Sequence, residues 1–268
     1  MSSFEQYLAV GERAARAGGQ LLLKLRGRVS PREKGPRDLV TDADLASQSA
    51  IEELIRGSVP DHRFVGEETG FATPLPRGST NASEYRWIVD PLDGTANYVH
   101  GFQAYCVSVA LERAGEPVVG VVYDPVRDEC FAASAGGGTY LNGERVYVSG
   151  CRRLREALVG ASFSANVPRD SEEISRFVEV LVASQSIRRL GSTALMMSYV
   201  AAGRLDAYWS TGAKVWDVAA GVVLVREAGG VITSVDGLPF QLPRPWVAAS
   251  GAPELHAELL AALARGAP

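Results

Sequence analysis

Acidic residues occur in four separated segments of this 268-residue chain, each at the end of a predicted strand or the start of a predicted helix. The segments read DLVTDAD at 38–44, GEE at 66–68, DPLDGT at 90–95 and WD at 216–217. If the fold buried these acids together without partners, their charges would repel and raise one another's pKa. A pair of divalent cations resolves that conflict, because carboxylates are hard oxygen ligands of the kind that Mg²⁺ prefers.

The segment Asp90–Thr95 has the most informative spacing. The apolar residues WIV deliver its first aspartate to a strand end, and Pro91 favours an extended conformation there. A sharp turn at Leu92 would aim its carbonyl inward beside both carboxylates, while Gly94 permits close approach of the backbone. These oxygens suit Mg²⁺, and free N–H groups at a following helical turn suit a phosphate. Taken alone, the segment is equally compatible with an Asp-rich turn on the surface.

Two further acids, Glu67 and Asp217, each have an ordinary alternative explanation. Glu67 ends a short strand predicted over 63–67 and could simply be exposed to solvent. Asp217 could be only the N-cap of the helix predicted over 216–228. That helix is apolar on most sides and is expected to be buried, so its N-terminal aspartate lies inward, where the helix dipole favours an anion. Taken together, the acids favour one buried cluster.

Hydrophobic periodicity and turn residues predict the elements that would position these acids. An amphipathic helix is expected over 4–25, and a second helix is expected after DLVTDAD, through about residue 59. Residues 30–36 and 73–83 are rich in turn formers and are expected to be loops. A hairpin is expected from CVSVALE and VVGVVYD around Gly115 and Pro117. Further strands are expected at 63–67, 86–89, EALVGAS, LDAYW, VITSV and WVAAS, and further helices over 171–183, after RRLG, over 216–228 and from Pro253 onward.

Composition restricts the class of protein. Hydrophobic residues make up 46% of the chain and charged residues 22%, which is typical of a globular protein. The net charge is −4 and there is no block of Lys and Arg, so no nucleic-acid partner is expected. Three cysteines without a CxxC motif, no signal-like N-terminus and no apolar run of spanning length predict a cytoplasmic protein without a membrane partner.

The acidic motifs have a family resemblance. WIVDPLDGTANYVHG, with GEE upstream and WDVAAGVVLVREAGG downstream, resembles the inositol monophosphatase family, which is Mg²⁺-dependent and lithium-sensitive and belongs to a wider group with fructose-1,6-bisphosphatase. The resemblance covers nearly the whole chain. It implies a mixed α/β fold, a layered α/β/α/β/α sandwich, as one domain over 1–268 with two closely packed lobes of about 1–145 and 146–268. It also implies a homodimer that binds a small phosphorylated substrate.

The resemblance implies roles residue by residue. Glu67, Asp90 and the Leu92 carbonyl match the ligands of a first Mg²⁺, and Asp90, Asp93 and Asp217 match those of a second. Glu67 also borders a weaker third site, so two or three Mg²⁺ ions are expected. Two such cations about 3.5–4 Å apart can hold the attacking and leaving oxygens in line.

Catalytic and substrate-binding roles follow from the same resemblance. Thr95, paired with Asp44, matches the hydroxyl that orients the attacking water, and Glu67 completes the expected catalytic set. The N–H groups of Gly94 and Thr95 match a phosphate cradle. The residues implied to contact substrate are Asp93, Gly94, Thr95, Gly191, Ser192, Thr193, Ser210 and Asp217.

The match departs from the family pattern at the substrate end. Many inositol-specific members carry a glutamate seven residues before the WD aspartate, where it binds inositol hydroxyls. Here that position is Ser210, which has no charge and a shorter reach, so the preference for inositol is open. Lys214 could attract a second anionic group, although a solvated surface lysine is an equal alternative. Lys34 could approach the phosphate.

Three functional hypotheses stay open. The first is a phosphatase for inositol 1-phosphate or related sugar and polyol monophosphates. Alternatives of the same class are fructose-1,6-bisphosphatase, histidinol-phosphatase and 3′-phosphoadenosine 5′-phosphate phosphatase; the NYVHG continuation favours the inositol-type branch over the nucleotide one. The third is a moonlighting regulatory binding protein, since some bacterial relatives bind the transcription machinery. The full set of acids argues against a protein without catalytic activity.

Overall fold

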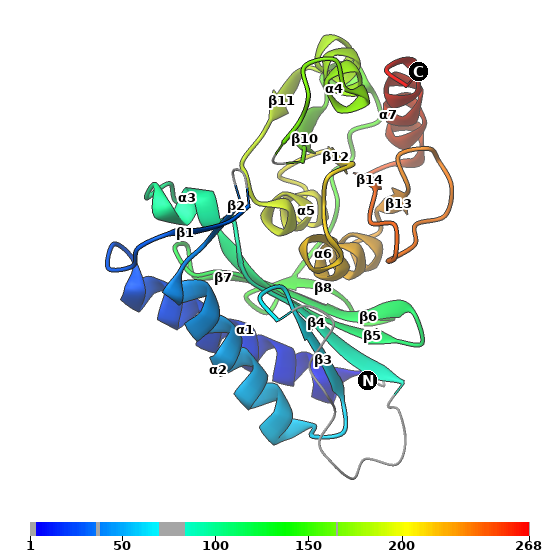
Figure 1. The fold of residues 1–268 in the computed structure, drawn as a ribbon. Helices are drawn as coiled ribbons and strands as arrows, with labels where there is room; N and C mark the ends of the chain where they lie inside the picture. Colours follow the sequence, from blue (N-terminus) through cyan, green and yellow to red (C-terminus); the bar gives the residue numbers. More distant parts are fainter. Residues whose placement is uncertain (1–3, 36–37, 70–83, 165, 268) are drawn as a thin grey trace.

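The computed structural model describes residues 4–35, 38–69, 84–164 and 166–267, which form alternating layers of helices and strands (Figure 1). Two helices cover one face of a seven-stranded sheet, and two more lie between that sheet and a five-stranded sheet. A last pair of helices covers the outer face of the second sheet. The predicted α/β/α/β/α sandwich is therefore confirmed.

The seven-stranded sheet carries the acidic strand end. Its strands lie in chain order, and only the first pair is parallel. Because helices α1 (Glu5–Leu25) and α2 (Asp42–Ser58) bury their apolar faces on one side, the sheet is covered there. The strands are β3 (Arg63–Gly66), β4 (Tyr85–Asp93), β5 (Cys106–Arg113), β6 (Glu116–Asp124), β7 (Glu129–Ser134), β8 (Gly138–Leu141) and β9 (Glu144–Val146).

The five-stranded sheet has the strand order β11–β10–β12–β14–β13 and mixes parallel with antiparallel pairs. Its strands are β10 (Leu158–Ser162), β11 (Ser186–Arg188), β12 (Ala207–Ser210), β13 (Val231–Thr233) and β14 (Val247–Ser250). Helices α5 (Thr193–Ala201) and α6 (Val215–Glu227) lie between the two sheets, and α4 (Glu172–Ala183) and α7 (Pro253–Arg265) lie outside (Figure 1). A single 3-10 turn, Leu154–Glu156, precedes β10.

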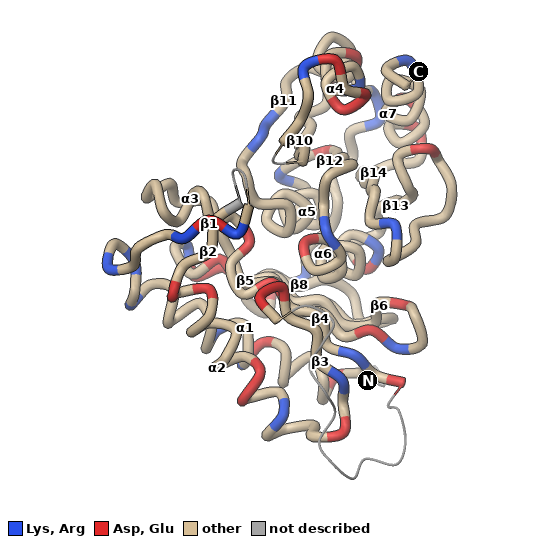
Figure 2. Tube along the Cα trace, in the orientation of Figure 1, with Lys and Arg blue, Asp and Glu red and all other residues tan. Residues whose placement is uncertain are grey.

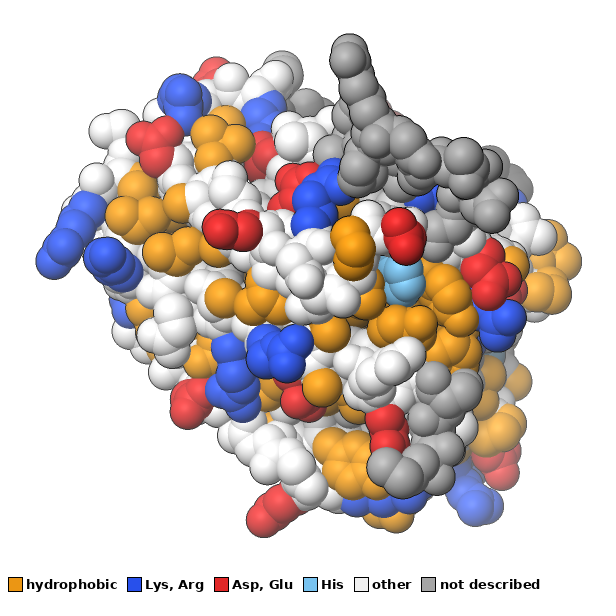
Figure 3. All heavy atoms as spheres, turned by 90° about the horizontal axis from the view of Figure 1, so that it is seen from below, with side chains coloured by type: hydrophobic (Ala, Val, Ile, Leu, Met, Phe, Trp, Pro, Cys, Tyr) orange, Lys and Arg blue, Asp and Glu red, His pale blue; other side chains and the backbone are white. Residues whose placement is uncertain are grey.

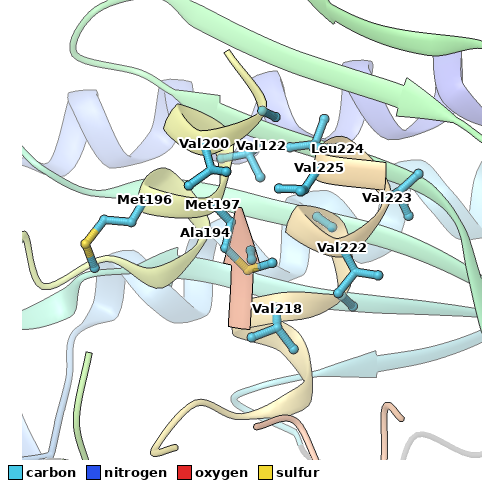
Figure 4. Close-up of a cluster of buried hydrophobic side chains, with 14 of the residues drawn as sticks. Val122, Ala194, Met196, Met197, Val200, Val218, Val222, Val223, Leu224 and Val225 are labelled. Atoms are coloured by element: carbon cyan, nitrogen blue, oxygen red, sulfur yellow. The ribbon is translucent and has the colours of Figure 1, made fainter. Parts of the chain in front are cut away.

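Helices α5 and α6 form the centre of the molecule because their residues are apolar on nearly every side. Figure 4 shows Met197 of α5 and Val218 of α6 in one buried cluster with Val122 of β6. The helices approach closely at Gly221, where an added Cβ would lie 2.6 Å from the Met197 Cβ. This packing fixes the first turn of α6, and with it the position of Asp217.

Most predicted elements are confirmed within one to three residues. Strand β4 runs four residues past its predicted end at residue 89, β7 and β11 had no separate predicted bounds, and two further regions differ. Residues 30–36 were expected to be a loop, whereas β1 (Arg32–Gly35) pairs antiparallel with β2 (Asp38–Val40). The residues of β1 are polar and give no strand signal by themselves. Their strand conformation is stabilised by the hydrogen bonds to β2. Strands β8 and β9 were not predicted, although Asn142 and Gly143 between them both adopt positive φ, as a tight hairpin turn requires. The loop predicted at 73–83 lies outside the described residues.

The surface shown from below carries charges of both signs scattered among apolar side chains (Figure 3). Among the helices of the described segments, none combines the length and the hydrophobicity needed to cross a bilayer.

Candidate active site

Strand β4 continues through the proline and carries both of its aspartates inward. Asp90 is 2% exposed and Asp93 is 8% exposed. A bulge separates them, because Asp90 pairs with Ser108 and Asp93 with Cys106, so three steps along β4 match two along β5. The Leu92 N–H donates to Asp90 Oδ1 at 3.0 Å, which closes the turn around the first carboxylate. The bulge therefore brings both carboxylates to one strand end.

The start of α5 holds Asp93 in place. Its Oδ2 accepts hydrogen bonds from the Ser192 hydroxyl at 2.7 Å and from the Ala194 N–H at 2.6 Å. The buried thiol of Cys106 lies 3.8 Å from the same oxygen. Burial raises the pKa of Asp93 to about 6, although the bonds from α5 act in the opposite direction. The Ser192 hydroxyl, which was expected at the substrate, is therefore directed at Asp93.

Asp90 is the centre of an acidic cluster. Burial raises its pKa well above the ordinary range, and the charges of Glu67, Asp93 and Asp217 raise it further. Burial and Asp93 likewise raise the pKa of Asp217. Glu67 directly follows β3 and Asp217 lies in the first turn of α6. Figure 2 shows acidic residues in both of these segments.

Asp217 reaches this cluster from the first turn of α6. It is half-buried and is the third residue of the helix, so the alternative of a simple N-cap is wrong. Its Oδ2 accepts a hydrogen bond from the backbone N–H of Lys214 at 2.7 Å, which is the backward half of a capping box. One carboxylate oxygen is thus engaged by the helix start.

Asp44 and Thr95 meet beside the cluster. Asp44 is fully buried in the first turn of α2, where its Oδ2 accepts bonds from the Thr41 N–H at 2.8 Å and the Thr41 hydroxyl at 2.7 Å. The Thr95 hydroxyl lies 3.1 Å from Asp44 Oδ1 and 3.1 Å from the Leu92 carbonyl oxygen. Gly94 makes this turn with φ of 101°, where an added Cβ would lie 2.9 Å from the Ala104 carbonyl oxygen.

Lys34 of β1 binds the GEE segment. Its ammonium lies 2.9 Å from Glu67 Oε1 and 2.6 Å from Glu68 Oε1. Burial lowers the Lys34 pKa, but the two glutamates more than offset this and hold it above its usual value. Burial raises the pKa of Glu68 to about 7. Sequence reasoning assigned no role to Glu68, although its place beside Glu67 in the GEE motif was a usable signal.

A cavity of about 630 Å³ opens beside the acids. Asp93, Asp217, Gly191 and Thr193 are among its lining residues. Ser210 is fully buried on β12 and does not line the cavity in the described part of the chain. The substrate-binding role expected for Ser210 thus has no direct contact to support it here.

The carboxylates of Asp90, Asp93 and Asp217 suit a divalent cation because of their combined negative charge. They do not form a complete coordination shell as they stand. Across the described residues, no three His, Cys, Asp or Glu side chains are arranged to hold a metal ion as they stand. However, burial and mutual repulsion disfavour the ionised forms of Asp90, Asp93 and Asp217, and a cation among them would relieve both effects.

Comparison with known proteins agrees with this geometry. The model that describes the inositol monophosphatase family matches residues 3–267. A relative from Aquifex aeolicus, named fructose-1,6-bisphosphatase/inositol-1-monophosphatase, is 41% identical over 244 residues, which cover 90% of this chain and 89% of the relative. A Pseudomonas aeruginosa relative named Nus factor SuhB is 40% identical over 236 residues, 86% of each chain. The solved inositol monophosphatase from Anabaena superposes with a TM-score of 0.86 at 35% identity and covers 100% of this chain and 98% of that one.

Proposed function

Because the chain belongs to the inositol monophosphatase family, we propose that it hydrolyses inositol 1-phosphate or related sugar and polyol monophosphates, using two Mg²⁺ ions to activate water. Enzymes of this family are phosphatases that generally depend on a metal, typically Mg²⁺. The observation that carries the proposal is the buried cluster of Asp90, Asp93 and Asp217, which opens onto a cavity of substrate size.

The proposal assigns metal-binding roles to five residues. Glu67, Asp90 and the Leu92 carbonyl would hold one Mg²⁺, and Asp90, Asp93 and Asp217 a second. Bound cations supply Lewis acidity at the phosphoryl oxygens and lower the pKa of water. The protein's own contribution is to hold these carboxylates close together, where only Glu67 has a basic partner, Lys34, among the described residues.

Thr95 and Asp44 would orient the attacking water. When the Thr95 hydroxyl donates its proton to Asp44, its oxygen lone pairs are free to accept a hydrogen bond from water. The water's own lone pair is then available for attack on phosphorus. Asp44 is fixed by Thr41, so the pair needs little reorganisation during the reaction. Backbone N–H groups of Gly94 and Thr95 would meet the phosphoryl oxygens.

Substrate contacts are proposed at the cavity wall. Gly191 and Thr193 line the cavity and would touch the organic part of the substrate. Thr193 is held by the Tyr208 hydroxyl, which lies 3.0 Å from its own. Ser192 would act through Asp93, as a positioning residue.

A phosphate-release assay over a panel of phosphomonoesters tests the proposal. The expected result is activity that requires Mg²⁺ and is inhibited by Li⁺. Asp93→Asn is expected to lose most of that activity. If Asp93→Asn kept near wild-type turnover in saturating Mg²⁺, the two-metal assignment would be wrong. We further propose that the chain forms a homodimer and is cytoplasmic. Light scattering on the purified protein measures its molar mass and so tests the dimer.

The Pseudomonas relative favours a second proposal. Its name, Nus factor SuhB, suggests that this chain also acts as a regulatory binding protein. A pull-down with the purified chain tests this role, and the D93N variant separates it from catalysis. Binding should be unchanged in that variant if the role is independent of hydrolysis.

A further inference from the structure

Among the described residues, Arg189 is the basic side chain that lines the cavity beside the acids. Arg189 contributes to the wall together with Phe163, whereas Asp93 and Asp217 contribute the acidic part. Lys214, the other basic candidate near the site, lines a separate cavity of about 310 Å³ next to Trp216. In the described part of the chain, Arg189 is therefore the basic residue that a molecule in this cavity meets.

Arg189 is held in a defined position although its side chain is exposed. Its guanidinium carbon lies 5.2 Å from the centre of the Phe163 ring. Phe163 is itself anchored. Its ring packs edge-on against Phe177, with 5.1 Å between the ring centres, and at a tilt against Trp209, with 5.9 Å between the ring centres. Stacking leaves the N–H edges of a guanidinium available to an oxyanion. Within the described residues, Arg189 forms no ion pair with an acid.

Glu173, which bonds to the loops beside this wall, does not compete for that charge. Strand β12 reads AYWS and ends at Ser210, so it presents no carboxylate here. Among the described residues, Glu173 of α4 bonds to the loops beside this wall. Its Oε1 accepts bonds from the Thr211 hydroxyl at 2.8 Å and the Ser164 N–H at 3.2 Å, and its Oε2 accepts the Ser164 hydroxyl. Glu173 is thus occupied in joining two loops.

We propose that Arg189 binds a second anionic group of the substrate, so that this chain prefers small phosphomonoesters that carry a further phosphate or carboxylate. The inference rests on the proposed function, because the scissile phosphate is placed at the acidic cluster. Arg189 is a specificity residue in this scheme and takes no part in bond breaking. A guanidinium suits either group, since it pairs with both through two parallel N–H donors.

Matched substrate pairs test the inference. Glycerol 2-phosphate and 2-phosphoglycerate differ by a carboxylate, and fructose 1-phosphate and fructose 1,6-bisphosphate differ by a phosphate. We expect wild-type kcat/KM to favour the more anionic member of at least one pair, and the pair that does so identifies the group. Arg189→Gln should reduce that ratio by about 10-fold, mainly through KM, since charge-assisted pairs are worth roughly that factor at a partly exposed site.

Arg188 provides the control. It is also exposed, but it bonds to Ser186 and the Ile187 carbonyl and does not line the cavity within the described residues. Arg188→Gln should leave both ratios unchanged. Equal ratios in wild type and Arg189→Gln would overturn the inference.

A binding measurement separates the inference from the proposed function. Calorimetry gives the dissociation constants of 2-phosphoglycerate and glycerol 2-phosphate for the wild type, R189Q and R188Q. These constants report binding and do not depend on a rate of hydrolysis. If binding discriminates through Arg189 but neither ester is hydrolysed, the proposed activity fails and the anion site stands. If both are hydrolysed and neither binding nor kcat/KM depends on Arg189, the anion site fails and the activity stands.

Discussion

The Thr95 hydroxyl lies 3.1 Å from Asp44 Oδ1, which joins two residues 51 positions apart into one hydrogen-bonded pair beside the acidic strand end. If the pair orients water as a unit, Thr95→Val and Asp44→Asn should each lower kcat by about 100-fold. The double variant should be little worse than either single one, because residues that act together are not additive. Steady-state kinetics on the three variants measure this.

Thr95→Ser is the matched control for this pair, since it keeps the hydroxyl and should retain most of the activity. Asp44→Asn has a second effect, because Asp44 also accepts two bonds from Thr41 at the start of α2. We expect a loss of about 1 kcal/mol in the free energy of unfolding from that weakened cap. A fully additive double variant would contradict the pairing.

The acidic cluster should make the metal-free protein less stable as the pH rises. The folded pKa of Asp90, Asp93 and Asp217 is raised, so their contribution to stability is present below the unfolded pKa of about 4. It is lost as pH rises through the folded values, which for Asp93 is about 6. With EDTA, the contribution of Asp93 should therefore lower Tm as pH rises from about 4 through about 6, and excess Mg²⁺ should reduce that fall.

Asp90→Asn isolates the electrostatic part of this effect. The amide cannot ionise, so the variant should show a smaller fall of Tm with pH in EDTA and a smaller gain from Mg²⁺. It should also lose phosphatase activity. A variant that kept the full pH dependence would show that the repulsion does not centre on Asp90.

The fold could be predicted further than the site. Periodicity identified α1, α2 and α6 because each buries an apolar stripe or an apolar surface. Strand β1 was missed because its residues are polar and its hydrogen bonds come from β2. The contact between Ser192 and Asp93 spans 99 positions and has no local signal at all. What the sequence could not specify is which side chains the packing of α5 turns toward the acids.

Two helical glycines, one at the α5–α6 contact and one in α2, should respond in opposite directions to an added Cβ. Gly221→Ala places a Cβ 2.6 Å from Met197 Cβ, so we expect a loss of about 1–3 kcal/mol in the free energy of unfolding. Gly57 lies near the end of α2, and an added Cβ there meets nothing within 4 Å. Gly57→Ala should therefore stabilise by about 0.5–1 kcal/mol, as is usual for a helical glycine. Urea unfolding of both variants checks the two signs.

His62 should make the protein less stable as the pH falls below neutrality. Its Nδ1 accepts a hydrogen bond from the Trp87 indole N–H at 3.1 Å, and its ring stacks on Tyr85 at 4.8 Å. A protonated imidazole has no acceptor, so charging the ring breaks the bond to Trp87. Burial lowers the His62 pKa, while Asp61 partly opposes this.

The sign of the His62 effect follows from that lowered pKa. A base with a depressed folded pKa contributes stability that is complete above its unfolded pKa of about 6.5 and is lost as pH falls toward the folded value. Burial also lowers the pKa of His256, so His62→Gln should remove only part of the dependence. We expect urea unfolding between about pH 7 and pH 5.5 to show a shallower slope in His62→Gln than in the wild type. An unchanged slope would mean that His62 has the same pKa in the folded and unfolded states, which would contradict the prediction.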